Sequence, residues 1–437
     1  MTRLETLAAF VSGSGMDALA AHERAALRHH AIDAAVALVA GAASPEGREL
    51  AGLLGPGARA SEQAGVAAAV IRSTEVDDIH IESCVTPTSV AMPAALLAHE
   101  DSARYAGAQA ENAIRIALEL SVRMGLAIEG PNALYRGVWP TCFATPLAVS
   151  AALCRMRGLD EARTAHALSM ALMMSSGRIG RFAGQPTGRW IVLNAAFADG
   201  VRAYEAGAHG YKGDVGLLDG PWLQNALGYA PQLDALVEDL PASRAMGGLG
   251  MKPFSTARQA LAPTQALIEL IAEGLSPGDI QSIEVRVPEA YAAMISRPLE
   301  PYRSSTYSNA GFQMALAALA PDHLLDLDRA QVIADPAILA FAGKVSVKAD
   351  ASLQTDYPRV WAGEIAVRTG HGGFTRKVLT PRGDAANRMS DEEIAAKHMR
   401  LLSAALGSAR AQEALATLRA AFEAPAPAIA LMRSALT

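Results

Sequence analysis

The chain has 437 residues, with 38 Lys and Arg against 44 Asp and Glu and a formal net charge of −6 at pH 7. This balance argues against nucleic-acid binding, which requires clustered basic residues that displace counterions from phosphates. Hydrophobic residues make up 51% of the chain but aromatic residues only 5%, and alanine, the best helix former, dominates. No stretch reaches the roughly 18 to 20 apolar residues of a membrane span.

The cysteines and the first residues indicate the compartment. Cys84, Cys142 and Cys154 form no CxxC pair, and an odd count in a long chain is typical of a reducing environment. The N-terminal segment carries acidic residues and a helical pattern where a signal peptide would carry an apolar block. We therefore expect a cytoplasmic, Ala-rich and mainly helical protein.

The first 210 residues are predicted to form successive helices, because apolar residues recur at helical spacing between short Gly, Pro and Ser breaks. Asp160 is the expected N-cap of one of them. The predicted helices of this part cover 17–42, 93–99, 107–125, 144–157 and 160–176. They form a series of helical hairpins.

The pattern changes after residue 250. A helix over 256–274 is followed by alternating segments that predict strands, and the last of them is the hairpin partner of the one before it. These segments are 281–288, 343–349, 362–368 and 374–381. We expect a three-stranded antiparallel sheet with covering helices, and then a C-terminal helix that begins near Ser390 with an acidic first turn.

The predicted fold is therefore mainly α, with a large all-helical domain and a smaller α+β domain. The expected limits are 1–250 for the helical domain, 251–384 for the α+β domain and 385–437 for C-terminal helices that return to the first domain. No low-complexity linker separates these parts.

The densest polar group in an apolar setting contains Asp77, Asp78 and His80. Two adjacent carboxylates beside a histidine can orient a base or hold a proton. The alternative is a capped helix start with a solvated run of charges. A metal site is not expected, because no second His or Asp cluster follows at ligand spacing.

A Pro-bounded turn contains Trp139, Thr141 and Cys142 and leads into a helix. Free backbone N–H groups at a helix start suit a carboxylate, although a packed turn is the alternative. Cys142 can act as a base or nucleophile only if its pKa is lowered.

Three other segments carry candidate residues. Arg178, Arg181 and Arg189 lie on a Gly-rich stretch and indicate an anionic small ligand, since Arg pairs with carboxylates through two hydrogen bonds. Lys252 follows a second Gly-rich stretch and can bind a carboxylate or act as a base when desolvated. Tyr307 lies in a polar loop that either lines a site or caps a helix. Surface positions are the alternative for all of these cations.

Taken in order, these segments resemble the MmgE/PrpD family, which includes 2-methylcitrate dehydratases, cis-aconitate decarboxylase and iminodisuccinate epimerase. The resemblance covers nearly the whole chain. It rests on Asp77–Asp78, Pro140–Thr141, the segment 158–171, Lys252-Pro253-Phe254, the strand at 280–287 and the ending at 383–398.

The resemblance implies a helical domain, an α+β lid, an active site in the cleft between them and a homodimer. It also implies no metal or organic cofactor and a reaction that begins with removal of a proton next to a carboxylate. Such a reaction needs a base, cations for the developing negative charge and often a general acid.

The resemblance also assigns residues. Asp77 or Asp78 matches the family's aspartate, and Lys252 matches its lysine. Arg189 stands where decarboxylase-like members carry a lysine. Three family histidines are replaced by Thr86, by Trp139 and by the stretch 257–259, and the family's tyrosine is replaced by Phe312. The remaining pattern looks closer to the epimerase-like branch.

The resulting hypothesis is an enzyme acting on a small di- or tricarboxylic acid. His80, oriented by Asp77 or Asp78, is the first candidate base, and Lys252 is the second base or a stabilising cation. The expected substrate-binding residues are Trp139, Thr141, Cys142, Arg189, Arg258 and Tyr307. A dehydratase-type lyase ranks narrowly before an epimerase, and a non-catalytic carboxylate-binding relative and a helical scaffold rank below both.

Overall fold

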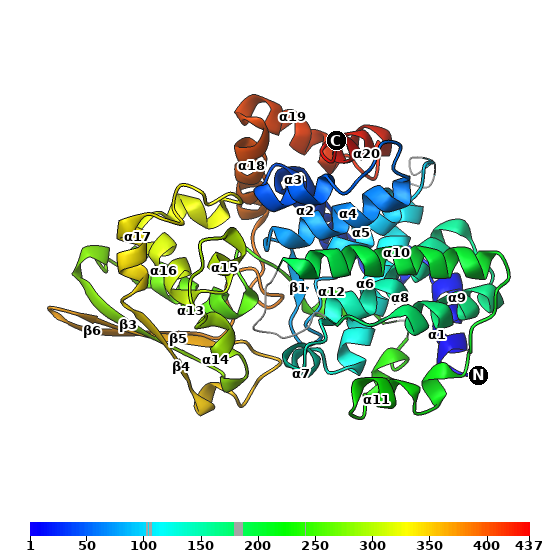
Figure 1. The fold of residues 1–437 in the computed structure, drawn as a ribbon, viewed down its shortest axis with the longest axis horizontal. Coiled ribbons are helices and arrows are strands. Elements are labelled where there is room, and N and C mark those ends of the chain that lie inside the picture. Colours follow the sequence, from blue (N-terminus) through cyan, green and yellow to red (C-terminus); the bar gives the residue numbers. More distant parts are fainter. Residues whose placement is uncertain (102–103, 105–106, 179–186, 241) are drawn as a thin grey trace. The chain divides into compact units, whose positions relative to one another are not determined.

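The computed structural model describes the whole chain except residues 102–103, 105–106, 179–186 and 241. The described residues divide into two compact units (Figure 1). The first unit consists of Met1–Ser73, Asp77–Leu249 and Ala405–Thr437, and the second of Thr74–Val76 and Gly250–Ala404. The domain limits expected from the sequence, at 250 and 384, remain a prediction.

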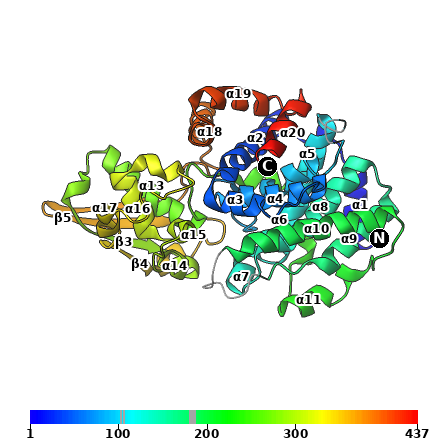
Figure 2. The same ribbon diagram turned by 45° about the horizontal axis from the view of Figure 1, so that its top comes forward.

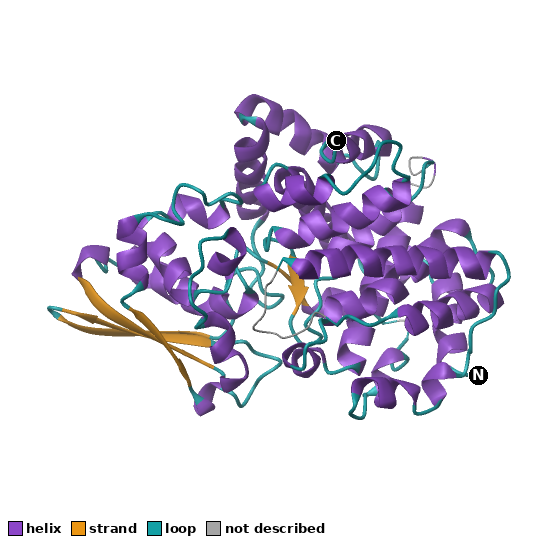
Figure 3. Ribbon diagram, viewed as in Figure 1, coloured by secondary structure: helices purple, strands orange, loops and turns teal. Residues whose placement is uncertain are grey.

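The first unit is built from helices, as the Ala-rich periodic pattern predicts (Figure 3). Its helices are α1 (Arg3–Gly13), α2 (Ala21–Ala42), α3 (Pro45–Ala51), α4 (Ala60–Ser73), α5 (Thr88–Leu96), α6 (Ala108–Ala127), α7 (Gly130–Tyr135), α8 (Pro140–Arg157), α9 (Glu161–Met174), α10 (Gly188–Ala208), α11 (Trp222–Leu227), α12 (Ala245–Gly248), α19 (Ser408–Arg419) and α20 (Pro425–Ser434). The predicted N-cap is confirmed, because the Asp160 side chain accepts a hydrogen bond from the backbone N–H of Arg163.

Small side chains let these helices pack closely. Helix α10 lies against α4, α8 and α9, and α6 packs on α8, an arrangement visible in Figures 1 and 2. A Cβ atom at Gly200 of α10 would lie 2.8 Å from the carbonyl oxygen of Pro146 and 2.6 Å from Cβ of Val149. Only glycine therefore permits this separation between α10 and α8.

The second unit contains a mixed sheet of four strands. The strands are β3 (Ile280–Val287), β4 (Val345–Ala349), β5 (Gly363–Thr369) and β6 (Gly372–Val378), in the order β4-β3-β5-β6. Strands β3 and β4 are parallel, whereas β3–β5 and β5–β6 are antiparallel. The predicted three-stranded antiparallel sheet was therefore wrong in strand number and direction. The reason is that a long helical connection separates β3 from β4, and such a crossover returns the chain parallel.

Helices cover this sheet. They are α13 (Arg258–Ala272), α14 (Glu289–Ile295), α15 (Arg303–Tyr307), α16 (Ala310–Leu319) and α17 (Pro336–Ala342), and α18 (Asp391–Leu406) leads back to the first unit. Helix α13 packs on β5 and β6, and α16 and α17 pack together on the same side (Figure 1). Alternate residues of β3 and β5, such as Ile283, Val285 and Ile365, are buried, as expected for a sheet with one covered face.

A separate two-stranded sheet joins β1 (Asp78–His80) and β2 (Leu249–Met251). Strand β1 carries two of the residues that the sequence analysis singled out. Within the described part of the chain, no helix has both the length and the apolar character needed to cross a bilayer.

Candidate active site

Asp77 forms a buried ion pair in the first unit. Its Oδ1 atom lies 3.2 Å from Nη1 of Arg72, and both side chains are almost completely buried. Arg72 lies in the last turn of α4, so the chain folds back on itself within a few residues. The pairing compensates the burial of two charges that would each be costly alone.

Arg72 belongs to a cluster of two arginines and two tryptophans. Its guanidinium carbon lies 5.1 Å from the ring centroid of Trp139 and 5.7 Å from that of Trp190. Arg189 lies 5.4 and 4.2 Å from the same two centroids, and the two indole rings meet edge to face. Cations at these distances are attracted by the negative faces of the indole rings, which helps to hold the two arginines in place.

The cluster lies at the start of α8, the helix that follows the predicted turn. Trp139 is the N-cap, and no side chain caps the helix there. The Oγ1 atom of Thr141 accepts a hydrogen bond from the backbone N–H of Thr86 at 3.1 Å. Arg189 lies beside the uncapped start of α8, where backbone N–H groups and the helix dipole suit a carboxylate.

Cys142 lies in the same turn but is completely buried. Burial raises the pKa of its thiol well above the usual range, although Arg72 and Arg189 act in the opposite direction. A thiol in this state is neutral at physiological pH, so it contributes shape rather than a nucleophile or base.

Asp78 is held by a different set of groups. Its Oδ1 accepts from the backbone N–H of Thr88 at 3.3 Å, and its Oδ2 accepts from the Thr88 hydroxyl. The Nδ1 atom of His30, on α2, lies 3.2 Å from Oδ2. Asp78 therefore has a fixed orientation and a histidine neighbour that the sequence analysis did not identify.

His80 is buried, with both ring nitrogens engaged. The backbone N–H of Ser83 donates to Nδ1 at 3.3 Å, and the ring also makes a hydrogen bond with the backbone of Arg244. Desolvation by burial lowers the pKa of His80 to about 4, outweighing the Arg244 bond and the charge of Asp78. The imidazole is therefore neutral over the physiological range.

Lys252 is buried in the second unit and bonds to a segment that we call the strap, Thr74–Val76. Its Nζ lies 3.1 Å from the carboxylate and 3.2 Å from the carbonyl oxygen of Glu75. Ser255 donates to the Thr74 carbonyl at 2.7 Å, and Lys397 to the Val76 carbonyl at 2.9 Å. These bonds hold the Nζ atom of Lys252 in place, and its role as second base or stabilising cation remains a prediction.

Arg258 opens α13 in the second unit. One Nη2 hydrogen bond reaches Oδ2 of Asp384 at 2.5 Å, and its guanidinium carbon lies 5.9 Å from the ring centroid of Trp361. The side chain is 2% exposed, yet Nε and Nη1 have no hydrogen-bond partner among the described residues.

Tyr307 is also buried in the second unit, at the end of α15. The guanidinium carbons of Arg329 and Arg303 lie 4.6 and 5.2 Å from its ring centroid. Burial lowers the pKa of Arg329 to about 10, and its guanidinium donates to the Thr306 hydroxyl and to the carbonyl of Ser255. Tyr307 therefore lies in a cationic cluster, and its assignment to substrate binding remains a prediction.

The predicted site residues are thus distributed over both units. Lys252, Arg258 and Tyr307 belong to the second unit, and the rest of the predicted residues to the first. Of the Gly-rich arginines, Arg178 pairs with Val138 through a β-bridge, whereas Arg181 lies outside the described residues.

Sequence reasoning did not assign His30, Arg72, Glu75 or Asp384. Each gave a weak signal in the sequence. His30 and Arg72 interrupt apolar runs, whereas Glu75 and Asp384 lie in polar segments that were considered for other residues. In the described part of the chain, no three His, Cys, Asp or Glu side chains gather as a metal site requires. The lack of a cofactor remains a prediction.

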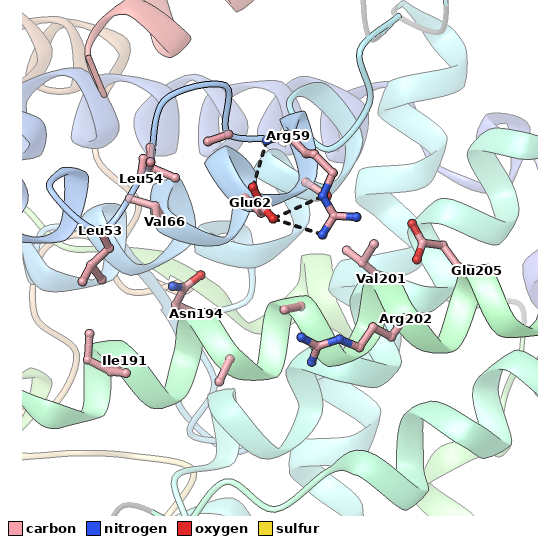
Figure 4. A pocket seen from close by; sticks show the side chains of 15 residues that line it. Leu53, Leu54, Arg59, Glu62, Val66, Ile191, Asn194, Val201, Arg202 and Glu205 are labelled. Atoms are coloured by element: carbon pink, nitrogen blue, oxygen red, sulfur yellow. Dashed lines mark hydrogen bonds and ion pairs between the residues drawn. The ribbon is translucent and has the colours of Figure 1, made fainter.

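The first unit also has an open cavity of about 270 Å³ between the residues before α4 and helix α10 (Figure 4). Apolar side chains such as Leu54, Val66 and Val201 line it, and the Arg59–Glu62 ion pair lies at its edge. None of the predicted site residues lines this cavity, so it is distinct from the candidate site.

Comparison with known proteins assigns both halves of the chain to one family. The model of the MmgE/PrpD N-terminal domain matches residues 5–230, and that of the MmgE/PrpD C-terminal domain matches residues 254–421. No curated protein matches the chain. Because the two matches follow in order and cover most of its length, the chain belongs to the MmgE/PrpD family.

Proposed function

We propose that the protein is an acid–base enzyme that removes a proton next to a carboxylate of a small di- or tricarboxylic acid, as a dehydratase-type lyase. Membership of the MmgE/PrpD family indicates a dehydratase- or lyase-type enzyme. We further expect a cytoplasmic homodimer that needs no cofactor. The choice of substrate class rests on the hydrogen bonds that the buried Arg258 side chain makes and lacks.

Arg258 keeps two buried nitrogens without a partner among the described residues, while Asp384 holds the third. A buried donor that makes no hydrogen bond costs about 1–3 kcal/mol. A carboxylate ligand removes this cost, and the uncapped start of α13 adds favourable backbone dipoles. The fixed guanidinium is therefore suited to a carboxylate of the substrate.

The other cations support the same substrate class. Lys252 and Arg258 lie six positions apart in one segment of the second unit, and Arg72 and Arg189 belong to the first. Removal of a proton next to a carboxylate creates negative charge on that group, and fixed cations stabilise it. Several such cations in a chain of net charge −6 indicate a local site for an anion rather than general binding of polyanions.

An epimerase is the second candidate. The positions at which the family carries three histidines hold Thr86, Trp139 and the stretch 257–259. A lyase needs an acid for its leaving group, whereas an epimerase needs a second base on the opposite face of the substrate carbon. The reduced number of imidazoles favours this alternative.

The test is proton exchange in D₂O with succinate-like and citrate-like acids, followed by ¹H NMR. Loss of water from a substrate supports the lyase. Deuterium entering a stereocentre without loss of any group supports the epimerase and refutes the lyase. If the purified protein neither exchanges nor converts any of the acids, the proposed function is wrong.

A variant of Arg258 tests whether this side chain binds a carboxylate of the substrate. Arg258→Lys keeps the charge but loses the planar set of donors, so KM for the active acid should rise about 10- to 100-fold, the value of one charged hydrogen bond. Arg202→Lys, at an exposed position of α10, is the matched control and should leave KM unchanged. An unchanged KM in Arg258→Lys would remove the argument for this site.

A further inference from the structure

Glu75, the central residue of the strap, has a strained backbone conformation. Its φ angle is +55°, in the left-handed region where a side chain other than that of glycine meets steric strain. The residue is 4% exposed, and its carboxylate accepts a hydrogen bond from Nζ of Lys252 at 3.1 Å. A conformation of this kind persists only where surrounding groups fix it, and such residues cluster at functional sites.

The two peptide groups that flank Glu75 are both held by hydrogen bonds. In the preceding peptide, the carbonyl oxygen of Thr74 accepts from the Ser255 hydroxyl at 2.7 Å. In the following peptide, the carbonyl oxygen of Glu75 accepts from Nζ of Lys252 and from the backbone N–H of Thr256, both at 3.2 Å. The N–H of that same peptide donates to Oγ1 of Thr74 at 3.3 Å. Because φ and ψ describe the orientations of these two planar groups, the bonds fix the conformation of Glu75.

Ser255 is itself held in place. The residue is completely buried, and its backbone N–H donates to the carbonyl of Leu324 at 3.0 Å. Its own carbonyl accepts from Nη2 of Arg329 at 2.6 Å and from Nε2 of Gln313 at 3.2 Å. The hydroxyl therefore projects from a fixed backbone, so its bond to the strap has a defined direction.

We infer that Ser255 is a positioning residue for the proposed reaction, because its hydroxyl holds Glu75 in the conformation that orients the Lys252 ammonium. This inference rests on the proposed function, in which Lys252 stabilises the developing charge or acts as second base. Without the hydroxyl, the peptide between Thr74 and Glu75 can rotate, which relieves the left-handed strain and moves the carboxylate away from Lys252. A misplacement of about 1 Å in a group that acts on the reacting carbon can lower the rate about 100-fold.

The experiment compares kcat and KM for the converted acid in wild type, Ser255→Ala and Ser169→Ala. Ser169 is the matched control, because its buried hydroxyl also donates to a backbone carbonyl at 2.7 Å, that of Asp214 in the first unit. Ser255→Ala should lower kcat about 10- to 100-fold with KM nearly unchanged, since Arg258 keeps its bond to Asp384. Ser169→Ala should leave both constants unchanged.

A double-mutant cycle with Glu75→Gln tests whether Ser255 acts through the strap. Glu75→Gln should lower kcat by itself, because Lys252 loses its charged partner. If the hydroxyl acts by placing this carboxylate, Ser255→Ala should cause little further loss in the Glu75→Gln background. If Ser255→Ala does not fold, Thr74→Val takes its place in the cycle, since it removes the oxygen that holds the next peptide at nearly constant volume.

Three results decide between a positioning role and a merely structural one. A fall in kcat that occurs in Ser255→Ala and is absent from the Glu75→Gln background supports the inference. An unchanged kcat in Ser255→Ala, an equal fall in Ser169→Ala, or losses that multiply in the double variant overturn it and leave the proposed function intact. If wild type neither exchanges nor converts any of the acids, the proposed function is wrong, and so is the role of Ser255.

Discussion

Replacing Glu119 with Gln is expected to lower the free energy of unfolding of the first unit by about 3–5 kcal/mol, the usual cost of breaking a buried ion pair. Glu119 lies on α6 and is completely buried, as is Arg123 one turn later. The Arg123 Nε donates to the carboxylate at 2.7 Å, Ser243 donates at 3.0 Å, and the backbone N–H groups of Arg244 and Ala245 donate at 2.9 and 3.1 Å. The pair thus ties α6 to residues 243–245.

The magnitude follows from these bonds. A Gln amide has one acceptor and one donor where the carboxylate has two acceptors. Either orientation places its NH₂ group against Arg123 or against the N–H of Ala245, so one buried donor loses its acceptor at about 1–3 kcal/mol. The bond to Arg123 also loses its charge assistance, worth about 1–2 kcal/mol. The two costs together agree with the range for a broken buried pair.

Urea unfolding followed by circular dichroism measures this loss. The control is Glu62→Gln, the same chemical change in a pair whose side chains are 48% and 68% exposed, where a surface ion pair contributes at most about 1 kcal/mol. If Glu119→Gln were no more destabilising than Glu62→Gln, the reasoning from buried hydrogen bonds would be refuted.

Two further predictions follow from burial. Folded His80 protonates near pH 4 and an unfolded histidine near 6.5, so acidification across this window favours the unfolded chain. Between pH 6.5 and 4, His80→Gln should therefore lose about 3 kcal/mol less free energy of unfolding than wild type. Parallel curves of unfolding free energy against pH for the two proteins would contradict this. The structure describes all three cysteines, Cys84, Cys142 and Cys154, as buried and without a disulfide. A thiol reagent should therefore label essentially none of them in the native protein and all three in urea. Rapid labelling of Cys142 in the native protein would contradict its burial.

The helices were predictable because their signal is local. Apolar spacing alone indicates α6, α8 and α9 within a few residues, and Asp160 marks a helix start through its own side chain. The sheet was less predictable, because the direction of β4 depends on how the connection after β3 returns. No pattern within 343–349 contains that information.

The site was predictable only where its residues are adjacent in sequence. Asp77 and Asp78 stand out as a pair, but their partners Arg72 and His30 lie in apolar helical stretches where a charged or polar residue has no local explanation. Similarly, Lys252 was identified while its carboxylate partner Glu75 was not assigned. These partners come from other segments of the chain, and no local pattern identifies them.

The strap, Thr74–Val76, has a consequence for recombination within the family. It belongs by its contacts to the second unit although the chain on both sides belongs to the first, and it supplies the carboxylate and carbonyl that bind Lys252. A chimera joined near residue 250 would combine the strap of one parent with the lysine of the other. Exchange of the C-terminal half between relatives therefore also requires exchange of these three residues, and a separately expressed C-terminal half would lack Glu75.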